Sequence, residues 1–186
     1  MIFRPVRYAP QVRLRRLPIV AHIISTAPLP NNKEKRKPYP MKIAIISLGC
    51  PKNQVDADVF CHALIKDGHT TTPELSEADC IIINTCGFIE SAKAEAIENI
   101  LTACQYKQAN PNLKVVVTGC LAERYKEQIV EEIPEVDAVV GLGSNKALPA
   151  IIARLSGNAP EHIECYGPKT DMPLGGARVI SSPRKK

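Results

Sequence analysis

The sequence predicts an α/β fold in which helices cover both faces of a parallel five-stranded sheet. Short aliphatic runs alternate with amphipathic stretches of helical period throughout residues 41–157. The aliphatic runs are continuously apolar, as in parallel strands buried on both faces. Right-handed crossovers and one switch point then favour a three-layer structure with the flavodoxin- or Rossmann-like strand order 2-1-3-4-5.

The expected strands are short and bounded by polar residues, Gly or Pro. They span residues 42–47, 70–72, 80–84, 114–118 and 137–140. The second strand, Thr70-Thr71-Thr72, has the weakest signal, because it rests on β-branched threonines alone. The other four strands are rich in Ile, Val and Ala, which fits a buried sheet.

The expected helices each have an apolar face and a recognisable end. They span residues 53–66, 90–109 and 121–132, with a last helix that ends at Gly157. Asn53 is suited to cap the first helix, and Ser144 or Asn145 is suited to cap the last. The helix over 90–109 stops at Asn110, because the residue before Pro111 disfavours helical dihedrals.

The two flanks differ from this body. Residues 1–40 hold nine Lys or Arg, one acid and seven of the sixteen prolines, so we expect a disordered extension. An Arg-rich, acid-free start also resembles a mitochondrial transit peptide, but sequence translated or assigned upstream of a start at Met41 is the favoured interpretation. Residues 158–186 lack periodicity and are expected to form a linker or tail. The domain is therefore placed at residues 41–157.

Charge and cysteine content exclude several classes of protein. The net charge of +5 comes from the first forty residues, which carry +8, so the body is mildly acidic and offers no basic patch for nucleic acid. No apolar run is long enough to span a membrane. Seven cysteines, an odd number without a secretory segment, favour a reducing cytoplasmic compartment over a disulfide framework. No C-x-x-C pair is present.

Three cysteines follow expected strands at matched positions, each next to a glycine. Cys50, Cys86 and Cys120 come after the first, third and fourth strands and are 36 and 34 positions apart, about one βαβ unit. In the expected strand order these strands are neighbours, and ligands of open α/β sheets bind beyond the carboxyl ends of strands. We therefore expect the three thiols to share one site.

The residues alone leave the occupant of this site open. Three thiolates without a fourth protein ligand suit an iron–sulfur cluster with one open iron, or a catalytic zinc with an open position. Adjacent helix N-termini would stabilise an anionic assembly. Lys52, Glu123 and Arg124 either line the mouth of the site or are surface residues of first helical turns.

The other four cysteines have simpler explanations. Cys61 and Cys104 fall in helices near apolar faces, where cysteine is a small buried hydrophobe. Cys80 begins its strand and belongs to the opposite edge of the sheet. Cys165 lies in the expected tail, where a solvated linker is favoured over a metal pair with His162. The turn at Gly141-Leu142-Gly143-Ser144 lacks the Lys of a phosphate-binding loop, so a plain turn is favoured there.

Three motifs in order resemble the N-terminal domain of radical-SAM methylthiotransferases. They are Leu48-Gly49-Cys50-Pro51-Lys52-Asn53 followed by Val55-Asp56, Asn84-Thr85-Cys86-Gly87-Phe88, and Thr118-Gly119-Cys120-Leu121-Ala122-Glu123-Arg124. The resemblance covers about residues 41–157. The motif Cys50-Pro51-Lys52-Asn53 is similar to the motif of the RimO-like branch. That branch modifies an aspartate of a small-subunit ribosomal protein, whereas the sister branch modifies adenosine in tRNA.

The resemblance implies a cofactor and a reaction. Cys50, Cys86 and Cys120 would hold an auxiliary [4Fe-4S] cluster whose open iron holds or delivers the inserted sulfur. SAM would enter only through a radical-SAM domain with a C-x-x-x-C-x-x-C motif, which this sequence lacks. We therefore expect a truncated or split enzyme that needs that domain, with a ribosomal small-subunit protein as family substrate and catalytic residues unknown.

Two alternatives remain. The chain could instead belong to a tRNA methylthiotransferase, or be a stand-alone cluster- or metal-binding module without catalysis. A separate radical-SAM polypeptide is an expected partner under the first interpretation, and no membrane partner is expected under any of them.

Overall fold

The computed structural model describes residues 40–157 and 162–166. The chain divides into two units, Met1–Lys35 and Arg36–Lys186, and every described element belongs to the second unit. The predictions for residues 1–40 and for most of 158–186 therefore fall outside the described residues.

The described elements alternate strand and helix along the chain. The strands are β1 Lys42–Ser47, β2 Thr70–Thr71, β3 Cys80–Thr85, β4 Lys114–Gly119, β5 Ala138–Val140 and β6 Ile163–Cys165. The α-helices are α1 Pro51–Lys66, α2 Glu90–Gln105, α3 Cys120–Glu132 and α4 Leu148–Leu155. Three short 3-10 helices occupy connections, η1 Leu75–Glu77, η2 Tyr106–Gln108 and η3 Leu142–Ala147. None of the helices described is long and apolar enough to cross a bilayer.

All strand pairs are parallel, and the sheet order is β2-β1-β3-β4-β5-β6. This confirms the predicted α/β class and the order 2-1-3-4-5. The sheet has a sixth strand that was not predicted, because β6 is only three residues long and lies in the segment expected to be a linker. Its middle residue, Glu164, is exposed, so it lacks the apolar run of a central strand.

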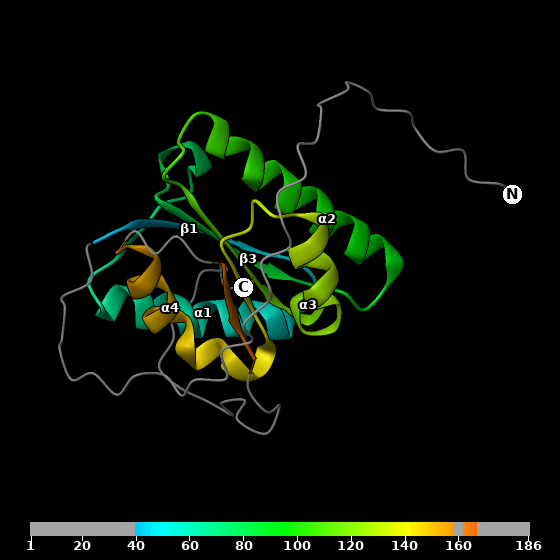
Figure 1. Ribbon diagram of the computed structural model, residues 1–186. Coiled ribbons are helices and arrows are strands. Elements are labelled where there is room, and N and C mark those ends of the chain that lie inside the picture. Colours follow the sequence, from blue (N-terminus) through cyan, green and yellow to red (C-terminus); the bar gives the residue numbers. More distant parts are fainter. Residues whose placement is uncertain (1–39, 158–161, 167–186) are drawn as a thin grey trace, which may run out of the picture. The chain divides into compact units, whose positions relative to one another are not determined.

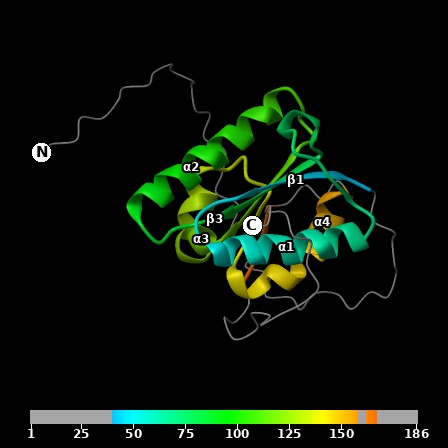
Figure 2. The ribbon, with the colours of Figure 1, turned by 180° about the vertical axis from the view of Figure 1, so that it is seen from behind.

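Helices cover both faces of the sheet, α2 and α3 on one face and α1 and α4 on the other (Figures 1 and 2), and an apolar cluster lies on each face. Residues of α2 and α3 pack on one face against alternate residues of the central strands, including Ile81, Ile83, Val115 and Val117. Residues of α1 and α4 pack on the other face around Ile82 and Val116. β3 is buried at all six positions, which places it at the centre of the fold.

Two helix starts differ from prediction. α1 begins at Pro51 with Cys50 as its N-cap, and no side chain caps it. Proline at the first helical position is already in helical φ, so the helix begins two residues earlier than expected. Asn53 is therefore inside the helix. α4 begins at Leu148 after Ala147, because Ser144 and Asn145 lie in the 3-10 helix η3 that precedes it.

Candidate metal centre at the carboxyl edge of the sheet

Strand register brings the ends of β1, β3 and β4 to one edge. Ser47 pairs with Asn84, and Asn84 pairs in turn with Thr118. Thr85 pairs with Gly119, the last residue of β4. Because the three strands are parallel and in step, the residues that follow them emerge side by side. This is the edge at which open α/β sheets bind ligands.

Each of the three predicted cysteines follows one of these strand ends. Cys50 is exposed and is the N-cap of α1, Cys86 comes directly after β3 and is 7% exposed, and Cys120 is the half-buried first residue of α3. All three are free thiols. Two of them thus lie at helix starts, where backbone N–H groups and the helix dipole favour negative charge.

The turn that carries Cys50 comes very close to Cys86. Gly49 has φ +89°, and a Cβ placed on it would lie 2.4 Å from the Cβ and 2.8 Å from the Sγ of Cys86. A side chain is therefore excluded at position 49 by both conformation and space. Gly119, with φ +97°, is equally confined, since its Cβ would lie 2.3 Å from the carbonyl oxygen of Thr85.

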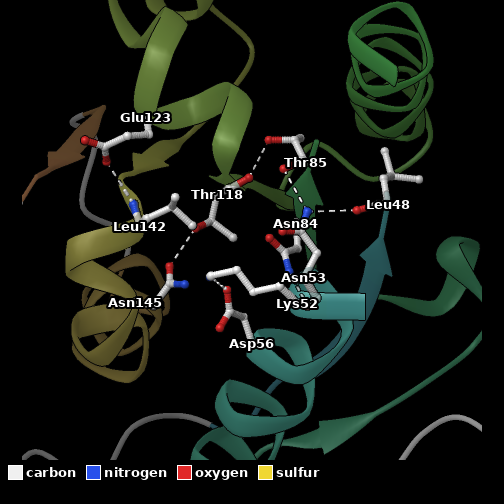
Figure 3. Close-up of polar contacts among 10 residues, drawn as sticks. All are labelled: Leu48, Lys52, Asn53, Asp56, Asn84, Thr85, Thr118, Glu123, Leu142 and Asn145. Carbon is white, nitrogen blue, oxygen red and sulfur yellow. Dashed lines mark hydrogen bonds and ion pairs between the residues drawn. The ribbon is translucent and has the colours of Figure 1, made fainter. Parts of the chain in front are cut away.

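Buried amides connect the first turn to the second (Figure 3). The Asn53 amide Nδ2 donates to the carbonyl oxygens of Leu48, at 2.8 Å, and Thr85, at 3.0 Å. Asn84 Nδ2 donates back to the carbonyl oxygen of Asn53 at 2.7 Å. Asn53 and Asn84 are both fully buried. The backbone N–H of Leu48 also donates to Asn84, at 2.9 Å.

A buried hydroxyl connects the second turn to the third (Figure 3). Thr85 Oγ1 donates to the carbonyl oxygen of Thr118 at 2.5 Å, and Thr118 Oγ1 donates to Asn145 Oδ1 at 2.7 Å. Thr85 and Thr118 are fully buried. The three turns are thus joined by hydrogen bonds, although each arises from a different part of the chain.

The pKa of the Cys120 thiol is raised by burial and is also affected by the neighbouring cysteines and cations. Burial is the main cause that raises the pKa of Cys120, followed by the charge of Cys86. Lys52 lowers the pKa of Cys120, Cys50 raises it, and Arg124 lowers it. The pKa of Cys120 thus depends on both other cysteines and on two cations. Metal binding would require the Cys120 thiol to lose its proton, which burial disfavours.

The charged residues of the motifs have defined partners. Arg124 Nη1 donates to the carbonyl oxygen of Gly87, the residue after Cys86, at 3.0 Å. Lys52 forms an ion pair with Asp56 one turn along α1. Glu123 Oε2 accepts a hydrogen bond from the backbone N–H of Leu142 at 3.0 Å (Figure 3). A carboxylate thus accepts the backbone N–H at the start of η3, in agreement with a plain turn at Gly141 and not a phosphate-binding loop.

The donor set suits a sulfur-ligated metal, although the thiols are not gathered around a point. Within residues 40–157 and 162–166, no group of three or more His, Cys, Asp or Glu side chains is arranged to hold a metal ion. Thiolate ligands select zinc and iron–sulfur clusters. A cysteine sulfur moves between χ1 rotamers, and the exposed Cys50 can do so without displacing a packed neighbour. By the chemistry of their free thiols, the three residues therefore suit such a group.

Three of the remaining cysteines, Cys80, Cys61 and Cys104, lie away from this edge. Cys80 begins β3 at the opposite edge of the sheet and is fully buried, and burial strongly raises the pKa of its thiol. Cys61 lies within α1, and burial raises the pKa of its thiol as well. Cys104 packs against the core from α2, and burial raises its pKa to about 11. Cys165 lies in β6.

Sequence reasoning did not assign Asn84, Thr85 or the contact of Arg124. A signal for the first two was present, because two polar residues end an otherwise apolar strand that is buried on both faces. Polar side chains in such positions are almost always hydrogen-bonded. The Arg124 contact joins residues 37 positions apart and depends on how α3 packs beside β3.

Comparison with known proteins supports the motifs. A family model described as "Uncharacterized protein family UPF0004" matches residues 42–141, more than half of the chain and all three cysteines. A ribosomal protein uS12 methylthiotransferase RimO from Clostridioides difficile is 50% identical over 117 residues, which cover 62% of this chain and 26% of that protein.

Other relatives with the same name extend the match. The protein from Geobacter sulfurreducens is 44% identical over 143 residues, covering 76% of this chain and 32% of its own length. That from Koribacter versatilis is 41% identical over 152 residues, covering 82% of this chain and 28% of its own length. The chain thus spans a quarter to a third of these relatives, and the predicted resemblance to methylthiotransferases is confirmed. The chain belongs to the UPF0004 family.

Proposed function

We propose that residues 41–157 form the cluster-binding domain of a methylthiotransferase and that Cys50, Cys86 and Cys120 ligate a [4Fe-4S] cluster. The observation that carries the proposal is that these thiols follow three adjacent parallel strands at one sheet edge. Three thiolates leave one iron of such a cluster without a protein ligand. When bound, the cluster would hold or deliver, at that iron, the sulfur to be inserted.

The surrounding residues would hold the thiolates and balance their charge. Cys50 and Cys120 lie at the starts of α1 and α3, whose positive ends favour anions. Lys52 and Arg124 lower the pKa of Cys120. Gly49 allows its turn to approach Cys86 as no other residue could. The site thus combines soft ligands, positive charge and a turn shaped for close approach.

The relatives suggest the substrate. Their names refer to methylthiotransferases of ribosomal protein uS12, so we propose that this chain contributes to the same modification, in the cytoplasm where ribosomal proteins reside. SAM cleavage requires an iron site that binds SAM. The 186 residues contain no C-x-x-x-C-x-x-C motif, so we assign that step to a radical-SAM partner or domain outside them.

Anaerobic reconstitution tests the cofactor. The chain is incubated with ferrous iron, sulfide and a thiol reductant, desalted, and assayed for iron, sulfide and zinc, and the dithionite-reduced sample is examined by EPR. The proposal predicts about four irons and four sulfides per chain and the signal of a reduced [4Fe-4S] cluster. Binding of about one zinc without sulfide would identify the catalytic-zinc alternative instead.

A further inference from the structure

Side-chain hydrogen bonds join the three cysteine turns in sequence. Asn53 donates to Leu48, two residues before Cys50, and to Thr85, the residue before Cys86. Thr85 donates to Thr118, two residues before Cys120. Each bond, drawn in Figure 3, ends on a backbone carbonyl, and that carbonyl lies within two residues of a cysteine in the sequence.

These bonds do not belong to the regular ladder of the sheet. A strand that is buried on both faces needs no polar side chains, and burying an amide or hydroxyl is unfavourable unless it is hydrogen-bonded. Asn53 and Thr85 are nevertheless fully buried, at 0% exposure. Their donors reach from one strand end to the next at the carboxyl edge, where Thr85 and Gly119 form the last pair between β3 and β4. They therefore restrain the turns relative to one another.

We infer that Asn53 and Thr85 are positioning residues for the metal centre. Asn53 holds the turn that carries Cys50 beside the turn that carries Cys86, and Thr85 holds the Cys86 turn beside the turn that carries Cys120. The inference rests on the proposed function. Mutation of a group that orients the ligands of a metal site typically lowers the metal affinity by about 10- to 100-fold. Neither side chain is itself assigned as a ligand.

The first test uses an isosteric pair at Thr85 in the full chain. Thr85→Val removes the hydroxyl and keeps the β-branched shape, whereas Thr85→Ser keeps the hydroxyl. After reconstitution, transfer of iron to a chelator should be about tenfold faster in Thr85→Val than in the wild type and close to wild type in Thr85→Ser. A wild-type rate in Thr85→Val, or a fast rate in Thr85→Ser, would overturn the inference.

A matched control separates positioning from stability. Asp137 accepts a hydrogen bond from the backbone N–H of Val115 at 2.7 Å at the other end of β4, and it pairs with Lys107 and Lys114. Asp137→Ala should lower the free energy of unfolding of the metal-free protein without accelerating iron transfer. If Asp137→Ala loses iron as fast as Thr85→Val, overall stability explains the effect and the inference is wrong.

The second test needs no metal, so it remains decisive if the proposed function fails. The metal-free chain is treated with a short bifunctional thiol reagent, and linked peptides are quantified by mass spectrometry. Thr85→Val should lower the yield of the Cys86–Cys120 link, and Asn53→Ala that of the Cys50–Cys86 link. Unchanged yields would contradict the inference, whereas a wild-type chain that takes up no iron and sulfide would contradict only the proposed function.

Discussion

Gly49 and Cys86 approach each other so closely that no side chain fits between them. A Cβ at position 49 would lie 2.4 Å from the Cβ of Cys86 and 2.8 Å from its sulfur. The residues are 37 positions apart, on the turns after β1 and β3. Their contact means that the conformation of the first turn sets the space available to the second cysteine.

Gly49→Ala should therefore cost both stability and cluster binding. The positive φ alone disfavours Ala by about 1–2 kcal/mol, and overlap with Cys86 adds about 1–3 kcal/mol. Gly68→Ala is the matched control, since Gly68 has φ +96° but no heavy atom within 4 Å of its Cβ position. Urea unfolding and iron content are the measurements. Equal losses in the two variants would show that the contact with Cys86 is unimportant.

His69 should make stability depend on pH. Burial lowers the pKa of His69 below its ordinary value of 6.5, and Asp67 opposes this only in part. The Nδ1 atom accepts a hydrogen bond from the backbone N–H of Met41 at 3.2 Å, which requires an unprotonated nitrogen. Because the unfolded chain binds the proton more readily, the stabilising contribution is complete above about pH 6.5 and is lost as pH falls toward the folded pKa.

This dependence is measured by urea unfolding of the metal-free chain between about pH 7.5 and about pH 5. The comparison is with His69→Asn, whose Oδ1 lies where Nδ1 of His69 does, can accept the same bond and does not titrate. The wild type should lose more stability than the variant below about pH 6.5. Parallel curves for the two proteins would show that His69 has no such role.

The sequence predicted the sheet well because its strands are continuous apolar runs, and the register confirms that Cys50, Cys86 and Cys120 follow neighbouring strands. That the three thiols share one site stays a prediction. The sequence did not predict β6, whose three residues carry no comparable pattern. The prediction that Asn53 caps the first helix is wrong, because Asn53 lies within α1 and donates to the carbonyl oxygens of Leu48 and Thr85. Asparagine is suited to both capping and such long-range bonds, and only the position of the Thr85 carbonyl in the fold distinguishes the two roles. Long-range polar contacts depend on packing that local patterns do not encode.

Residues 1–40 should contribute nothing to the stability of the domain. Their proline and charge content does not suit a buried core. A chain that begins at Met41 should therefore unfold at the same temperature as the full chain, measured by circular dichroism. A decrease of several degrees would show that the segment packs against the domain.

The reconstituted chain alone should not cleave SAM. Reductive cleavage requires an iron site that binds SAM, and the proposed open iron is assigned to sulfur. No 5′-deoxyadenosine should form when the chain is mixed with SAM and dithionite, and the product should appear when a radical-SAM polypeptide is added. Formation of 5′-deoxyadenosine by this chain alone would mean that its cluster has the catalytic part assigned elsewhere.

Iron content in single cysteine variants tests the central claim most directly. Cys50→Ala, Cys86→Ala and Cys120→Ala should each lose the cluster after anaerobic reconstitution. Cys104→Ala should keep it, because Cys104 packs against the core from α2, away from the strand ends. Cys61, Cys80 and Cys165 should be equally dispensable. Loss of iron in Cys104→Ala together with full iron in Cys86→Ala would contradict the account.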